Sequence, residues 1–172
     1  EMLAEDDPNS DGVHTINAAA GANGSISPLG NVTVNYYGDN QKFTFTQYAH
    51  YHVSDIIIDG VSVGPAPSYQ FTNVRRDHTI LVNFAIDTHT VTFVEGAGGT
   101  ITGSKAQVIP YGENCTPVTA VPNPGYCFVN WTGTGGFADT IQNPLSVTNI
   151  TSDMVITANF ASNTRKITAS AG

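Results

Sequence analysis

The chain carries little charge. Charged residues make up 12% of its 172 residues, about half of the roughly 25% that is typical of soluble domains. Lysine and arginine together number 6, against 14 aspartates and glutamates, so the formal net charge is −8. Nucleic acids and anionic membrane surfaces select basic patches on their partners. The composition therefore predicts no nucleic-acid partner and no attachment to acidic membranes.

Long apolar runs and catalytic motifs are also missing. No stretch reaches the about 18 consecutive apolar residues that a membrane-spanning helix requires, so we expect no membrane insertion. The sequence has no Gly-x-Ser-x-Gly nucleophile elbow and no glycine-rich loop that leads into a helix. The glycine-rich stretch 96–99 lies between two expected strands instead. We therefore expect no enzymatic activity.

The polarity of the chain comes from threonine, asparagine, serine and glycine. Residues 32–36 and 43–46 alternate apolar and polar side chains at period two, as half-buried strands do. Asp59-Gly60 between two β-branched runs predicts a tight hairpin. We find no segment with a convincing helical period, so the sequence predicts an all-β protein.

The pattern of one segment recurs in the next. Equivalent residues are 75 positions apart at the start of the repeat and 76 apart near its end: His14 and His89, Gly21 and Gly96, Tyr51 and Tyr126, Phe84 and Phe160. Residues 167–172 then copy residues 16–21, as the first strand of a third unit would. A small drift in offset indicates loop insertions on a shared scaffold.

The repeat divides the chain into four expected segments. They are an acidic N-terminal segment (1–13), two small β-sheet domains (14–86 and 87–161), and a linker with an orphan strand (162–172). Because the first residue is Glu rather than Met and no signal peptide is visible, we expect a mature or excised piece.

One aromatic stretch in the second repeat, ending at Trp131, holds the only tryptophan. Small units bury little surface, so we expect Trp131, with Tyr126 and Phe128, to anchor a core. The alternative use of such rings is a stacking face for sugars, which Trp131, Tyr126, Phe137 and Tyr111 could provide. Core packing is the favoured use of Trp131.

Both repeats, from His14 to Ala161, and the start of a third resemble the divergent internalin-type B repeat, and the second repeat is the closer match. The resemblance rests on Gly-Tyr-x-Phe-x-x-Trp at 125–131 and Thr-Asn-Ile-Thr-x-Asp-Met-x-Ile-x-Ala-x-Phe at 148–160. The first repeat departs from it, with His50 and Ile56 in place of the Gly and the Trp. The resemblance implies a small β-sheet module, in some relatives described as similar to a β-grasp fold. It also implies a bacterial extracellular or cell-surface location and brings no catalytic residues.

Two function classes follow from the repetition and the resemblance. The first is a non-enzymatic structural protein, either a cell-surface stalk or a filament subunit, whose partners are neighbouring repeats or other copies of the chain. The second is an adhesin or carbohydrate-binding module that recognises glycans. The low charge and the repetition favour the first class.

The orphan strand provides a route to assembly. If the chain continues, Lys166, Ile167, Thr168 and Ala169 begin a third repeat. If it ends at Gly172, their unpaired backbone groups are expected to add to an open sheet edge of another copy. Head-to-tail use of one strand per subunit builds a fibre unless the rotation closes a ring.

The acidic segment contains a calcium-like spacing. Asp7, Asn9 and Asp11 place oxygen ligands at alternate positions before Gly12. The twelfth position of such a loop falls on Ala18, so the bidentate glutamate is missing. The segment is either a calcium loop or a disordered acidic linker, and we expect no other cofactor.

The two cysteines, Cys115 and Cys127, flank a turn. If residues 115–120 and 126–131 form adjacent strands, the thiols lie close enough for a disulfide worth roughly 2–3 kcal/mol. The alternative is two buried thiols. His50 and His52 share one face of an expected strand and lack a third metal ligand, so an ordinary surface pair is favoured over a metal site.

Overall fold

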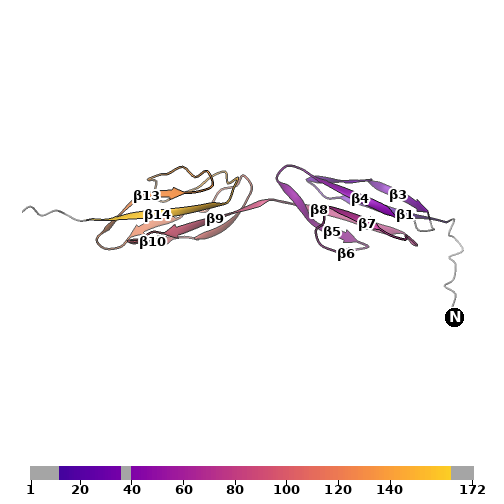
Figure 1. Cartoon of the computed structure of the whole chain (residues 1–172), viewed down its shortest axis with the longest axis horizontal. Coiled ribbons are helices and arrows are strands. Elements are labelled where there is room, and N and C mark those ends of the chain that lie inside the picture. The colour runs from indigo at the N-terminus through magenta and orange to yellow at the C-terminus, as the bar shows by residue number, and fades with distance from the viewer. Residues whose placement is uncertain (1–11, 36–39, 164–172) are drawn as a thin grey trace, which may run out of the picture. The chain divides into compact units, whose positions relative to one another are not determined.

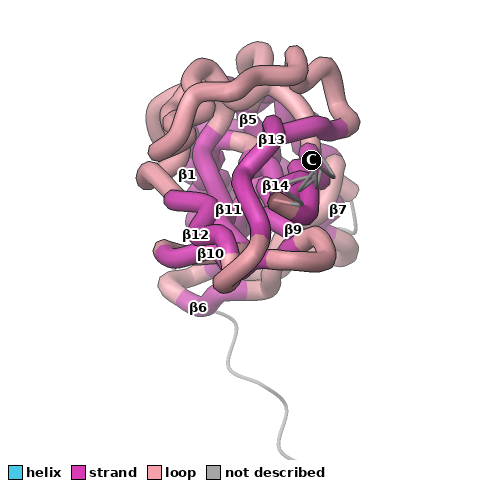
Figure 2. The backbone as a smooth tube through the Cα atoms, turned by 90° about the vertical axis from the view of Figure 1, so that its left-hand side faces the viewer, coloured by secondary structure: helices cyan, strands magenta, loops and turns pink. Residues whose placement is uncertain are grey.

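The computed structural model describes residues 12–35 and 40–163, which form strands and connecting loops without a helix (Figure 2). The all-β prediction is therefore confirmed. The chain divides into two compact units, Glu1–Ile86 and Asp87–Gly172.

The first unit contains a larger and a smaller sheet (Figure 1). The larger sheet has the order β3 (Gly30–Asn35), β1 (Val13–Ala20), β8 (His78–Ile86), β5 (Tyr51–Ile58) and β6 (Val61–Ser62). The smaller sheet has the order β2 (Gly24–Ser27), β4 (Gln41–Gln47) and β7 (Ser68–Phe71).

The second unit repeats this arrangement with fewer strands. Its larger sheet has the order β11 (Ala106–Pro110), β9 (Thr88–Glu95), β14 (Met154–Ser162) and β13 (Tyr126–Gly133). Its smaller sheet pairs β10 (Gly99–Thr102) with β12 (Thr119–Pro122).

The first and last strands of each unit lie side by side and parallel at the middle of the larger sheet. β1 pairs with β8 and β9 pairs with β14, with Ile16 opposite His78 and Val91 opposite Met154. Parallel strands require a crossover, which is usually a helix. In both units the chain between the two parallel strands instead forms the smaller sheet and the outer strands of the larger one.

Each core lies between the two sheets of its unit. The inward-facing residues alternate along the central strands, because side chains at period two share one face. The fully or nearly fully buried residues of the central strands are Ile16, Ala18, Ile80 and Val82 in the first unit and Val91, Phe93, Ile156 and Ala158 in the second. Each unit thus buries its own hydrophobic cluster.

Two turn glycines are required by aromatic rings from the last strands. A Cβ added at Gly24 would lie 2.3 Å from the ring of Phe84, and one at Gly99 would lie 2.3 Å from the ring of Phe160. The rings cover these glycines at equivalent places in the two units. This close approach explains why the turns after β1 and β9 end in glycine.

The predicted hairpin at Asp59-Gly60 is confirmed. Asp59 and Gly60 have φ values of 50° and 82°, and Ile58 pairs with Val61 across the turn. Positive φ at both central residues is the geometry that favours Asp-Gly in two-residue hairpins.

Candidate binding site in the second unit

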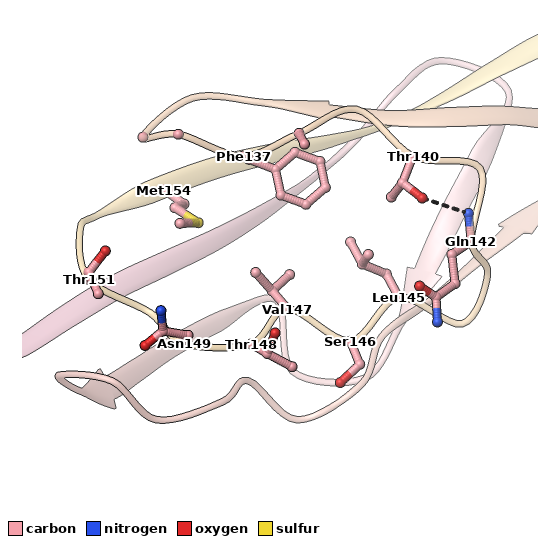
Figure 3. Close-up of a pocket in the computed structure, with 13 residues that line it drawn as sticks. Phe137, Thr140, Gln142, Leu145, Ser146, Val147, Thr148, Asn149, Thr151 and Met154 are labelled. Carbon is pink, nitrogen blue, oxygen red and sulfur yellow. Dashed lines mark hydrogen bonds between the residues drawn. The ribbon is translucent and has the colours of Figure 1, made fainter.

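The segment between β13 and β14, residues 134–153, forms an open pocket of about 440 Å³ (Figure 3). Phe137 and Met154 line one side of it and face Leu145 and Val147 on the other. Leu145 and Val147 are buried, while Phe137 and Met154 are half-buried. Phe137 and Met154 pack against the core cluster that contains Leu145 and Val147, so the apolar surface of the pocket is the partly exposed outer side of that cluster.

The two ends of the pocket are polar. Thr140 and Gln142 lie at one end, and Asn149 and Thr151 lie at the other (Figure 3). The Thr140 hydroxyl accepts a hydrogen bond of 3.2 Å from the Gln142 backbone N–H. The ends thus offer hydroxyl and amide groups, which both donate and accept hydrogen bonds.

Backbone hydrogen bonds hold both walls against the strands. Thr140 exchanges bonds of 2.8 and 3.1 Å with Trp131, and Leu145 exchanges bonds of 2.8 and 3.0 Å with Val118. The Asn143 side chain accepts from the Ala120 N–H at 2.9 Å and donates to the Ala120 carbonyl at 2.8 Å. Asn143 thereby acts like one more strand residue beside β12.

The far end of the pocket is anchored in the same way. Ile150 donates to the Glu113 carbonyl at 2.9 Å and accepts from the Gly112 N–H at 2.7 Å. The Ser152 hydroxyl donates to the Gly135 carbonyl at 2.7 Å, which joins the two branches of the loop. The loop has no regular strand of its own and is held by these hydrogen bonds instead.

Trp131 supports this loop from the core. Its ring is fully buried and packs edge-on against Phe93, with ring centroids 6.2 Å apart. Its indole Nε1 donates to the Gln142 carbonyl at 3.1 Å. The ring therefore presents no face to a sugar.

The other aromatic candidates divide between core and surface. Phe128 is partly buried and packs against Trp131 and Phe160. Tyr126 is 42% exposed, so its expected place in the core is wrong. Its ring covers Gly98, where an added Cβ would lie 2.2 Å from the ring. Of the proposed stacking faces, Phe137 is the one that lines the pocket.

The expected disulfide is not formed, because both cysteines are free. Cys115 is buried in the core, and burial raises the pKa of its thiol. Cys127 is exposed on β13, with its Sγ 3.5 Å from the Ala161 carbonyl. The prediction failed because β12 pairs with β10 while β13 pairs with β14, so the two segments are not adjacent strands.

Equivalent carboxylates tie the start of the first strand to the end of the crossover in each unit. The Asp77 side chain accepts from the Thr15 N–H at 2.8 Å, and that of Asp153 accepts from the Thr90 N–H at 2.9 Å. The backbone bond from Thr90, with a further contact from His89 at 3.3 Å, holds the pKa of Asp153 below its ordinary value. These contacts are structural.

Two further carboxylates, those of Asp59 and Glu95, accept hydrogen bonds from the backbone of neighbouring strands. Burial alone would raise the pKa of Asp59, but bonds from the Thr79 N–H at 2.8 Å and from His78 at 2.7 Å hold it below its ordinary value. The Ile101 N–H, at 2.8 Å, and Lys105 lower the pKa of Glu95.

The remaining site predictions fall elsewhere. The calcium candidates Asp7, Asn9 and Asp11 and the strand candidates 166–169 lie outside the described residues. His50 and His52 are exposed. Over residues 12–35 and 40–163, no three histidine, cysteine, aspartate or glutamate side chains gather as a metal site would require. No helix in this part of the chain could span a membrane.

Two all-β units of one topology, joined in tandem, define a β-repeat protein. Residues 89–164, most of the second unit, match the family model of the divergent InlB B-repeat domain, which confirms the resemblance. This family occurs in bacterial surface proteins, and the match indicates an extracellular repeat domain in the second unit. No curated protein and no solved structure matches the chain.

Proposed function

We propose that the chain is a non-enzymatic structural protein of the bacterial surface in which tandem β units act as a stalk. The supporting observation is the connection between the units. β8 ends at Ile86 and β9 begins at Thr88, so Asp87 alone separates them. The Asp87 carbonyl also accepts a hydrogen bond of 2.8 Å from the Tyr111 N–H. A single residue between two strands is far shorter than a flexible Gly/Ser-rich linker.

The position of the first strand also supports a stalk. β1 and β9 are each flanked on both sides within their own unit. Residues 167–172 repeat the β1 sequence, so in a longer chain they would take the central position of a further unit. Stacked repeats of this kind add length through units that each fold on their own core.

The stalk proposal can be tested by measuring the distance between the units. Spin labels are attached to Thr33→Cys and Asn123→Cys in a background that carries Cys115→Ala and Cys127→Ser. We expect one narrow distance distribution, and a broad one after a Gly-Ser insertion following Asp87. An equally broad distribution without the insertion would contradict the stalk.

The same structural protein could instead act as a subunit of a filament, which is the second structural role that we propose. The outer edges of β3 and β11 are unpaired in the described part of the chain, and such edges accept added strands. Residues Lys166, Ile167, Thr168 and Ala169 would supply the strand. Electron microscopy of the full chain and of a deletion of residues 165–172 tests this idea. Polymers that disappear on deletion, with monomers still folded, support it, whereas unchanged polymers contradict it.

The acidic segment adds a calcium proposal. We propose that Asp7, Asn9 and Asp11 bind calcium and order the segment ahead of β1. Because a ligand of the folded state stabilises that state, the melting temperature should rise with millimolar calcium and fall back with chelator. The variant Asp11→Asn should lose the shift. A melting temperature that does not change with calcium would contradict the proposal and favour an acidic linker.

A further inference from the structure

We propose that the pocket in residues 134–153 binds a neutral saccharide, as one sugar unit of a glycan. This binding activity goes beyond the structural role proposed above. It concerns the second unit alone, and three properties of the pocket lead to it: its charge, the placement of its polar and apolar groups, and its rigidity.

The lining excludes charged ligands. None of the residues that line the pocket carries a charge. Two aspartates lie next to the lining in sequence. Asp153 directs its carboxylate to the Thr90 N–H and to His89, and Asp139 is exposed but does not line the pocket. The chain as a whole carries a net charge of −8, which repels anions. A cation would find no counter-charge in the pocket, so the ligand is neutral.

The arrangement of polar and apolar groups matches a sugar ring. A pyranose has an apolar C–H face and a rim of hydroxyls. The half-buried Phe137 ring and Met154, which pack against the buried Leu145 and Val147 at the pocket, suit the apolar face (Figure 3). Thr140 and Gln142 at one end and Asn149 and Thr151 at the other suit the hydroxyls.

The amides at the two ends are available for a ligand. Within the described residues, the side chains of Gln142 and Asn149 form no hydrogen bond to the rest of the chain; the bonds of these residues are made by their backbone atoms. Each amide both donates and accepts, as sugar hydroxyls also do. We therefore assign Gln142 and Asn149 to hydrogen bonding and Phe137 to stacking.

The proposed site is preformed by backbone hydrogen bonds. The bonds of Thr140 to Trp131, Leu145 to Val118 and Ile150 to Glu113 fix both walls, so binding pays little for ordering the loop. Its volume of about 440 Å³ lies within the range of about 300–1,000 Å³ found for small-molecule pockets. Because the pocket is open and holds one ring, we expect a dissociation constant in the millimolar range.

The test is an NMR titration of the full-length, 15N-labelled chain. The probes are glucose, galactose, N-acetylglucosamine and their β-linked disaccharides, with glucose 6-phosphate as the charged counterpart of one of them. We expect at least one neutral sugar to shift amide signals of residues 134–154 in a saturable way. Glucose 6-phosphate should bind more weakly than glucose. No saturable shift in this segment with any neutral probe would overturn the proposal, as would tighter binding of the phosphate.

Variants separate a specific site from general surface contact. Phe137→Ala should raise the dissociation constant about tenfold or more, and Gln142→Ala should raise it by a smaller factor. Tyr126→Ala is the matched control, because Tyr126 is an exposed aromatic of the same unit outside the pocket. The indole N–H signal of Trp131 reports whether each variant is folded. If Phe137→Ala disturbs that signal, Gln142→Ala decides alone, since Gln142 is exposed. Unchanged binding in the deciding variant would overturn the assignment.

Free sugars and polymer-bound sugars share this chemistry. The full chain is therefore also passed over immobilised polysaccharides built from the sugar that binds best. Retention that Phe137→Ala abolishes identifies a glycan chain as the ligand. Retention that survives Phe137→Ala would contradict a glycan role for the pocket.

Discussion

The two units share a skeleton and differ in the crossover before their last strand. In the first unit, residues 59–77 form β6 and then β7, which pairs with β4. In the second, residues 134–153 form no strand and are held by the isolated bridges of Thr140 and Leu145. The central parallel pair is therefore the constant part of the repeat, and the crossover is the part free to acquire a binding role.

The cores of the units differ in a compensating way. Among the buried positions that are equivalent by the repeat offset, three show the difference most clearly: Phe43, Ile56 and Phe71 in the first unit, and Val118, Trp131 and Val147 in the second. The first unit places its aromatic bulk on the smaller sheet, and the second places it on the larger one. Cores accept such exchanges when the total volume is kept.

The largest test of this comparison is removal of the aromatic anchor. Trp131→Ala should destabilise the second unit by about 3–5 kcal/mol, because it leaves a large cavity and deprives the Gln142 carbonyl of its donor. Ile56→Ala should act on the first unit by about 2–5 kcal/mol. Urea unfolding followed by NMR signals from each unit measures both effects. Loss of both units together in either variant would show that they do not fold independently.

A second test uses equivalent glycines. A Cβ at Gly96 would lie 2.3 Å from the Ala158 backbone carbonyl oxygen, whereas one at Gly21 would lie 2.9 Å from the Asn83 side-chain oxygen. The side chain can move and the strand backbone cannot. Gly96→Ala should therefore cost about 1–3 kcal/mol and Gly21→Ala clearly less, in the same urea experiment. Equal destabilisation by the two substitutions would mean that the backbone beside Gly96 moves as easily as the Asn83 side chain beside Gly21.

A third test concerns Gln107, whose equivalent in the first unit is Val32. Gln107 is buried, and its side chain bonds to the Thr116 N–H at 2.8 Å and to the Ser104 and Thr116 carbonyls at 3.0 Å each. Gln107→Val leaves these backbone groups without partners, which should cost about 1–3 kcal/mol. Val32→Ala serves as the purely apolar control. If Gln107→Val leaves the stability of the second unit unchanged, water replaces the lost hydrogen bonds.

The sequence predicted the features that repeat. The offset between equivalent residues and the period-two runs identified the two β units, and Asp59-Gly60 identified its hairpin. The disulfide prediction failed because strand pairing does not follow chain order, so closeness of Cys115 and Cys127 in sequence said little about distance. The pocket was not predicted because residues 134–153 lack a periodic pattern, although Phe137 was a stacking candidate.

The smallest expected difference between the units is in how the stability of each unit changes at acidic pH. Glu95 occupies the position equivalent to Ala20, so the second unit alone has a carboxylate here. Bonds from the Ile101 N–H and from Lys105 hold the pKa of Glu95 below its ordinary value of 4.5. A lowered pKa stabilises the folded state above the ordinary value, and this contribution is lost as the pH falls through the lowered one.

Glu95→Gln removes that charge and nearly keeps the shape of the side chain. At about pH 7 the wild-type second unit should therefore be more stable than the variant. The difference should shrink as the pH falls below the ordinary value of 4.5. Because Trp131 is the only tryptophan, its fluorescence during urea unfolding reports on the second unit alone, while NMR signals of the first unit serve as the internal control. A difference that stays constant with pH would mean that the hydrogen bond from Ile101, and not the charge of Glu95, provides the stabilisation.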